Sequence, residues 1–130
     1  MSDYYNNAFF WQKLDTLFLS SGVKVTRKKG DIHPVFPNLI YPTDYGQMKD
    51  TNASFGHGVS VYCGSESRNR ITGIVVAVDI LAKELDVKVL AGCNEQEVED
   101  VLRFLNQTDY QKTVMLRRGS VIPSWGVTDN

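Results

Sequence analysis

The run ITGIVVAV, residues 71–78, is the sequence feature that most restricts how this chain can fold. Its residues are largely β-branched, which favours a strand. The segment GVSVYCG, residues 58–64, alternates apolar and polar residues between two glycines and predicts a second strand. Only a short polar loop, residues 65–70, separates them. This order predicts an antiparallel hairpin.

Two amphipathic helices are expected on either side of these strands. Apolar residues recur at three- and four-residue spacing over residues 8–21, where Asn7 can cap the helix and Gly22 can end it. The second helix follows Asn94 and Glu97, which resemble a capping box. Both helices should cover a core with their apolar side.

Further strands are predicted from shorter patterns. VKVTRKK (23–29), DVKVLAG (86–92) and KTVMLRR (112–118) each show strand-like alternation or β-branched residues. Segment 30–46 contains three of the four prolines, so we expect it to be extended or turning. Residues 79–85 fit either one helical turn or a continued edge strand.

These elements predict an α+β fold that is mainly β. The strands are spaced as hairpins and leave too few crossover helices for a parallel sheet, so we expect a small curved sheet or barrel with helices outside it. A chain of 130 residues, 42% of them hydrophobic, suits one domain with one core. The domain, residues 1–130, is divided into an N-terminal helix (1–22), a barrel (23–92), a helix (93–107) and a last strand with a tail (108–130).

Composition excludes several classes of partner. Fourteen basic and fifteen acidic side chains give a formal net charge of -1, so no bulk field would attract nucleic acid or an anionic membrane. The start of the chain does not resemble a secretion signal, and no apolar run reaches the roughly 20 residues that span a bilayer. We expect a soluble cytoplasmic protein. Cys63 and Cys93 are predicted to be buried, reduced thiols.

The stretch IYPTDYG, residues 40–46, is followed by a glycine-containing turn into a strand and later by DVKVLAG. Through these motifs the segment Lys24–Cys93 resembles the soluble (family I) inorganic pyrophosphatases, as a short, divergent member. The resemblance implies a closed five-stranded barrel of oligonucleotide-binding type with flanking helices, and a homo-oligomer. It also implies magnesium-dependent hydrolysis of diphosphate to two phosphates.

The resemblance assigns roles to individual residues. Tyr41 and Tyr45 match the two tyrosines that reach the phosphate site. Asp86 matches a metal-binding aspartate and Lys88 a phosphate-binding lysine, so both are expected to be catalytic. Lys29, at the end of a basic cluster, fits either a solvated strand end or a further phosphate ligand.

The sequence departs from the family at most metal-binding positions. Phe55, His57 and Ser60 stand where three carboxylates are expected, although Asp79 and Glu84 are close enough to offer a metal ligand. The family's early phosphate-binding lysine falls near Val35, and the segment bearing its arginine is deleted between Pro37 and Tyr41. An alternative is a transition-metal site of Asp86 with His57 and His33, because imidazole suits zinc, nickel or manganese.

Two functions of different class follow. The first is a divergent inorganic pyrophosphatase, or a hydrolase of another phosphoanhydride, impaired by the loss of metal ligands. The second is a non-catalytic binding or assembly module. We also expect Ile122 and Trp125, in the C-terminal tail, to dock on a neighbouring subunit or in a groove of their own domain.

Overall fold

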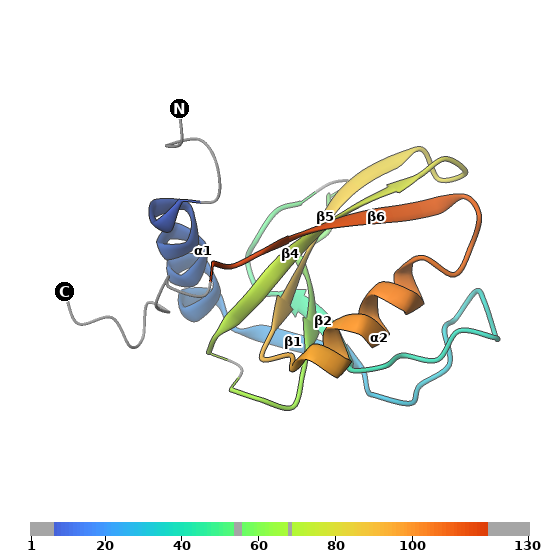
Figure 1. Cartoon of the computed structure of the whole chain (residues 1–130), viewed down its shortest axis with the longest axis horizontal. Coiled ribbons are helices and arrows are strands. Elements are labelled where there is room, and N and C mark those ends of the chain that lie inside the picture. The colour runs from blue at the N-terminus through green and yellow to red at the C-terminus, as the bar shows by residue number, and fades with distance from the viewer. Residues whose placement is uncertain (1–6, 54–55, 68, 120–130) are drawn as a thin grey trace.

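The computed structural model describes residues 7–53, 56–67 and 69–119. Helix α1 stands at one end of a twisted sheet and α2 lies along it (Figure 1). In chain order the elements are α1 (Ala8–Ser21), β1 (Val23–Arg27), β2 (Asp44–Met48), β3 (Ser60–Cys63), β4 (Ile71–Asp79), β5 (Glu84–Ala91), α2 (Glu95–Leu105) and β6 (Gln111–Arg117).

The six strands form one sheet in the order β1-β2-β3-β5-β4-β6. All pairs are antiparallel except β3 with β5, which are parallel. The predicted hairpin between segments 58–64 and 71–78 is therefore wrong, because β5 lies between β3 and β4. Strand β3 pairs with β2 on one edge and with β5 on the other, and all four of its residues are buried.

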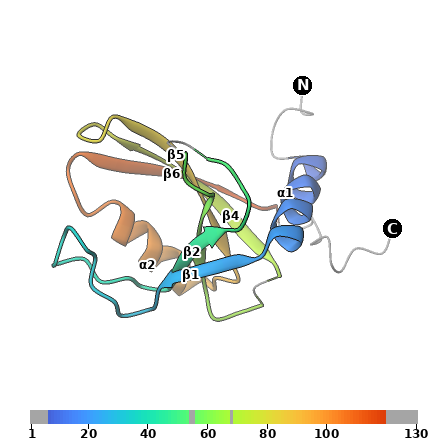
Figure 2. The same ribbon diagram turned by 180° about the vertical axis from the view of Figure 1, so that it is seen from behind.

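The expected closed five-stranded barrel was also wrong. The sheet has six strands, and β1 and β6 end it without pairing to each other among the described residues. Strand β2 was not predicted, since Asp44 and Gly46 rarely occur within strands. Gly46 is required there because a Cβ would collide with the backbone of Lys24 on β1. Figure 2 shows β1 and β2 side by side from behind.

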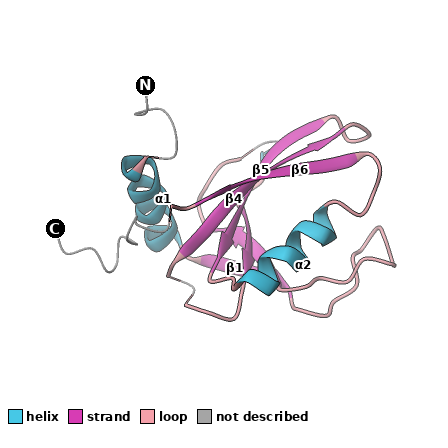
Figure 3. Cartoon of the chain, in the orientation of Figure 1, coloured by secondary structure: helices cyan, strands magenta, loops and turns pink. Residues whose placement is uncertain are grey.

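The two helices cover opposite faces of the sheet. Successive side chains along a strand point to opposite faces. Val61 and Val89 accordingly pack with Trp11 of α1, whereas Tyr62 and Leu90 pack in a second cluster with residues of α2. Helices outside a mainly β core were expected. Figure 3 shows the two cyan helices at separate places on the magenta sheet.

Both predicted helix starts are confirmed. The side chain of Asn7 accepts a hydrogen bond from the amide of Phe10 at 2.9 Å. Asn94 and Glu97 form the capping box, with each side chain accepting from the backbone of the other at 2.8 and 2.9 Å. The pKa of Glu97 is lowered: partial burial opposes ionisation, but hydrogen bonds from Asn94 and Ser65 outweigh it.

A buried ion pair joins the first helix to the end of the last strand. Arg118 donates two hydrogen bonds to the Asp15 carboxylate, at 2.8 and 2.7 Å, and both side chains are almost fully buried. The guanidinium also lies over the Trp11 ring, 5.7 Å from its centroid. This bidentate pair holds α1 against the sheet.

Segment 79–85 forms neither a helix nor a single continued strand. Strand β4 ends at Asp79 and β5 begins at Glu84, so residues 80–83 form a tight hairpin turn in which Lys83 has a φ of 58°. Cys63 and Cys93 are both buried thiols, as predicted, and burial first, then Glu97, raises the pKa of Cys93 to about 12. Neither described helix is long and apolar enough to cross a bilayer.

Candidate functional site

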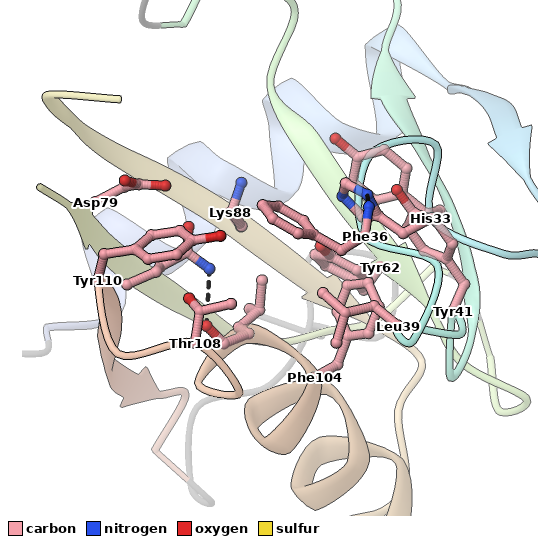
Figure 4. Close-up of a pocket in the computed structure, with 13 residues that line it drawn as sticks. His33, Phe36, Leu39, Tyr41, Tyr62, Asp79, Lys88, Phe104, Thr108 and Tyr110 are labelled. Atoms are coloured by element: carbon pink, nitrogen blue, oxygen red, sulfur yellow. Dashed lines mark hydrogen bonds between the residues drawn. The ribbon is translucent and has the colours of Figure 1, made fainter. Parts of the chain in front are cut away.

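An aromatic cavity of about 190 Å³ opens between α2, segment 30–41 and the strands (Figure 4). We call it the tyrosine pocket. Its lining includes His33, Tyr41, Tyr45, Tyr62, Lys88 and Phe104. Figure 4 shows Lys88 between Asp79 on one side and His33 on the other.

Strand register explains why these side chains meet. Tyr45 on β2 lies opposite Tyr62 on β3, and Ser60 on β3 lies beside Lys88 on β5. Partners in register share a face, and residues two apart along a strand do too. The face covered by α2 therefore carries both tyrosines and the lysine.

The wall of the pocket is a continuous aromatic cluster. The Tyr45 ring lies 4.9 Å from the Tyr62 ring and 5.4 Å from the Tyr41 ring, measured between centroids. Phe104 of α2 is 5.0 Å from Tyr41, and His33 stacks on Tyr41 at 5.8 Å with nearly parallel rings. Such contacts restrict ring motion and fix the positions of the polar ends.

The Tyr41 and Tyr62 hydroxyls stay protonated over the physiological range. Burial raises the pKa of Tyr62 well above its ordinary value, with smaller contributions from Tyr45 and Tyr41. The pKa of Tyr41 is also raised, mainly by burial and by Tyr45, although Arg27, hydrogen-bonded to it, acts in the opposite direction. Protonated hydroxyls can donate hydrogen bonds to an anion.

His33 is held as a neutral imidazole. Its Nδ1 accepts from the amides of Val35 and Phe36, at 3.0 and 3.2 Å, so the ring proton resides on Nε2. Burial, followed by the charge of Arg27, lowers its pKa. His33 thus gives the pocket a further neutral donor, its Nε2–H.

Lowering the pH should destabilise the protein through His33. Because its pKa is depressed in the folded state, its contribution is fully present above the unfolded value of about 6.5 and is lost as pH falls through the folded value. Urea unfolding of His33→Asn, whose Oδ1 can accept the same amides, should show a smaller loss of unfolding free energy between pH 8 and 5 than wild type. His57→Asn controls for removal of an imidazole. Equal pH dependence in wild type and His33→Asn would contradict the assignment.

The acidic candidates share this face, and two of them, Asp79 and Asp86, bond to other groups of the protein. Asp86 lies 3.4 Å from the Lys88 ammonium, with both side chains mostly buried. Asp79 accepts from the amides of Leu81 and Ala82, both at 2.9 Å. Glu84 is the register partner of Asp79. Among the described residues no three His, Cys, Asp or Glu side chains are grouped to hold a metal ion.

This donor set does not fit a magnesium cluster. Magnesium requires several hard oxygen ligands in a near-octahedral shell. Asp79 caps a turn and Asp86 pairs with a lysine, so both carboxylates already have partners. We therefore assign no chemistry at this site to magnesium.

Other predicted site residues lie elsewhere. Lys29 does not line the pocket; its amide donates to Asp44 at 3.0 Å, and its charge acts on Glu97. His57 is exposed in the segment before β3, and among the described residues it belongs to no group of three or more potential metal ligands. Ser60 is buried with its hydroxyl 3.0 Å from the Tyr45 hydroxyl. Phe55, Ile122 and Trp125 lie outside the described residues.

Among the pocket residues that sequence reasoning missed are Tyr62 and Phe104. Tyr62 is two positions from Ser60 on one strand, and Phe104 is three positions from Val101 on the apolar side of α2. Strand and helix periodicity could have placed both on the correct face.

No protein-family model and no curated protein match this chain. Among solved structures, it is similar to an inorganic pyrophosphatase from Helicobacter pylori, with a TM-score of 0.47 and 12% sequence identity over 75% of this chain and 75% of that chain. A similarity this weak carries no argument about activity.

Proposed function

We propose that this protein is a pyrophosphatase-like module that binds a phosphorylated small molecule, with diphosphate as the first candidate, in the tyrosine pocket. One observation carries the proposal: Lys88 shares the pocket with Tyr41, Tyr45 and Tyr62. A cation beside several hydrogen-bond donors is the arrangement that recognises phosphate oxygens. The IYPTDYG stretch and Lys88 also match the phosphate-binding positions of the family that the sequence resembles.

The size and walls of the pocket support a small anion. Its volume, about 190 Å³, lies below the roughly 300–1,000 Å³ of sites that hold drug-sized ligands. Arg27, hydrogen-bonded to Tyr41, adds a second positive charge beside the pocket. A compact di-anion would meet positive charge from both β1 and β5 there.

Metal-dependent hydrolysis of diphosphate is the second candidate. It is favoured by the position of Asp79, Glu84 and Asp86 on the same face of the β4–β5 hairpin as Lys88. The internal hydrogen bonds of Asp79 and the ion pair of Asp86 weigh against it. Binding without turnover therefore fits the contacts better.

Calorimetric titration with diphosphate, in the presence of a chelator, tests the first candidate. We expect Lys88→Met to weaken binding by roughly 10- to 100-fold, since a hydrogen bond to a charged group is lost. Lys83→Met, at the exposed turn between β4 and β5, removes the same charge outside the pocket and should bind like wild type. Wild type that binds neither diphosphate nor phosphate would contradict the proposal.

Asp86→Asn separates the two candidates. If the pocket only binds, removing the carboxylate releases Lys88 from its partner and should not weaken affinity. If Asp86 serves a metal, the substitution should abolish phosphate release. Colorimetric phosphate release with magnesium, manganese or zinc should stay far below the about 1 to 10³ per second of typical enzymes. Turnover in that range, lost with chelator and in Asp86→Asn, would establish hydrolysis instead.

A further inference from the structure

The face of the sheet that carries α1 continues as an apolar surface beyond the helix. Strand register places Val76 beside both Val87 and Val114, and Val78 beside Leu85. We call these five residues the apolar shelf. Val114 is 69% exposed, Leu85 66%, Val78 45% and Val87 43%.

The shelf is continuous with further exposed apolar side chains at both ends. At the hairpin tip Ile80 and Leu81 are each 69% exposed. At the other end Phe10 and Leu17 of α1 join Val87 in lining a cavity of about 340 Å³. Figures 1 and 2 show the tip of the β4–β5 hairpin at the opposite end of the molecule from α1.

Polar side chains contribute little to this surface. The charged residue in register with Val78 is Lys112, whose ammonium donates to the Asn106 carbonyl oxygen at 3.0 Å. The chain's net charge of only -1 gives little repulsion between like molecules. Monomeric proteins rarely expose a continuous apolar area of more than a few hundred Å². An apolar partner therefore suits the surface.

We infer that a second copy of this chain covers the apolar shelf, with the two sheets packed face to face about a twofold axis. A standard interface needs roughly 800 Å² from each partner. The apolar side chains that this surface can contribute are each more than a third exposed and extend from α1 across three strands to the hairpin tip: Phe10, Leu17, Val78, Ile80, Leu81, Leu85, Val87, Val114 and Leu116. The same patch on both molecules gives a self-complementary, closed contact.

The chain's own C-terminal segment is a less suitable occupant. After Gly119 it offers only Val121, Ile122, Trp125 and Val127 as large apolar side chains. These could fill the cavity beside α1 but would leave most of the shelf exposed. A second sheet covers the whole shelf at once.

Light scattering and sedimentation of the full chain test the inference between about 1 and 100 µM, the range in which moderate interfaces assemble. We expect a dimer whose dissociation constant rises about tenfold or more in Val114→Glu and in Leu85→Glu, because each substitution would bury a charge. Both positions are largely exposed in one copy, so folding should persist, as circular dichroism can verify. Ile40→Glu, at a position 57% exposed in the segment before β2, is the matched control and should leave the dimer intact.

Three results would overturn the inference. These are a monomeric wild type at 100 µM, a dimer that withstands both glutamate substitutions, and a dimer lost when the chain is truncated after Gly119. The last would make the tail the contacting element. A truncated dimer that still dissociates on Val114→Glu supports the shelf. None of these readouts depends on whether the tyrosine pocket binds diphosphate.

Discussion

Replacing Asp15 with alanine should lower the free energy of unfolding by about 3–5 kcal/mol, the cost of removing one partner of a buried ion pair. The Asp15 and Arg118 side chains are 0% and 1% exposed, so the guanidinium would keep its charge in a site without water. Urea unfolding, followed by tryptophan fluorescence, measures the change. Trp11 lies under the guanidinium and should report it directly.

Arg103→Ala is the matched control. It too removes one partner of an aspartate–arginine pair, in this case the arginine that bonds Asp100 at 3.0 Å, but the Arg103 side chain is 62% exposed. Exposed pairs contribute about 0–1 kcal/mol, so little should change. If Asp15→Ala costs no more than Arg103→Ala, the buried pair does not hold α1 in place.

Gly46→Ala should destabilise the protein by about 3 kcal/mol or more, at or above the usual range for overpacking. The new Cβ would collide with the Lys24 carbonyl oxygen and come within 2.8 Å of the Val25 Cα. Both are backbone atoms of the neighbouring strand and cannot turn aside as a side chain can. Thermal and urea unfolding would show the loss.

Gln47→Ala, one position along the same strand and only half-buried, controls for a change in β2. It should cost much less than Gly46→Ala. The new Cβ in Gly46→Ala should push β1 away from β2. The amides of β1 should therefore exchange hydrogen faster in Gly46→Ala than in wild type. A Gly46→Ala protein as stable as wild type would mean that β1 and β2 do not approach as closely as described.

Elements that depend on nearby residues were predictable from the sequence. Asn7 and the Asn94–Glu97 capping box determine the starts of both helices locally. Strands β1, β4 and β6 were found from alternation or β-branched residues. The insertion of β5 between β3 and β4 was not, because register between distant strands depends on the burial of whole faces rather than on any local pattern.

The site, like the fold, was predictable only in part from the sequence. Tyr41, Tyr45 and Lys88 were predicted to meet, and the structure brings them to one pocket. Lys29, which the sequence left open between a solvated strand end and a phosphate ligand, does not line the pocket. Tyr62 was missed, although strand periodicity places it on the same face as Ser60, two positions away on β3.

The ion pair between α1 and the end of β6 sets a condition on folding during synthesis. Asp15 and Arg118 are 103 residues apart, so the contact cannot form until all the residues between them have left the ribosome. At about 5–20 residues per second, that interval lasts on the order of 5–20 s. Throughout it the Trp11 side of α1 has no complete docking surface. We therefore expect the nascent chain to depend on chaperone protection at its first helix until its last strand emerges.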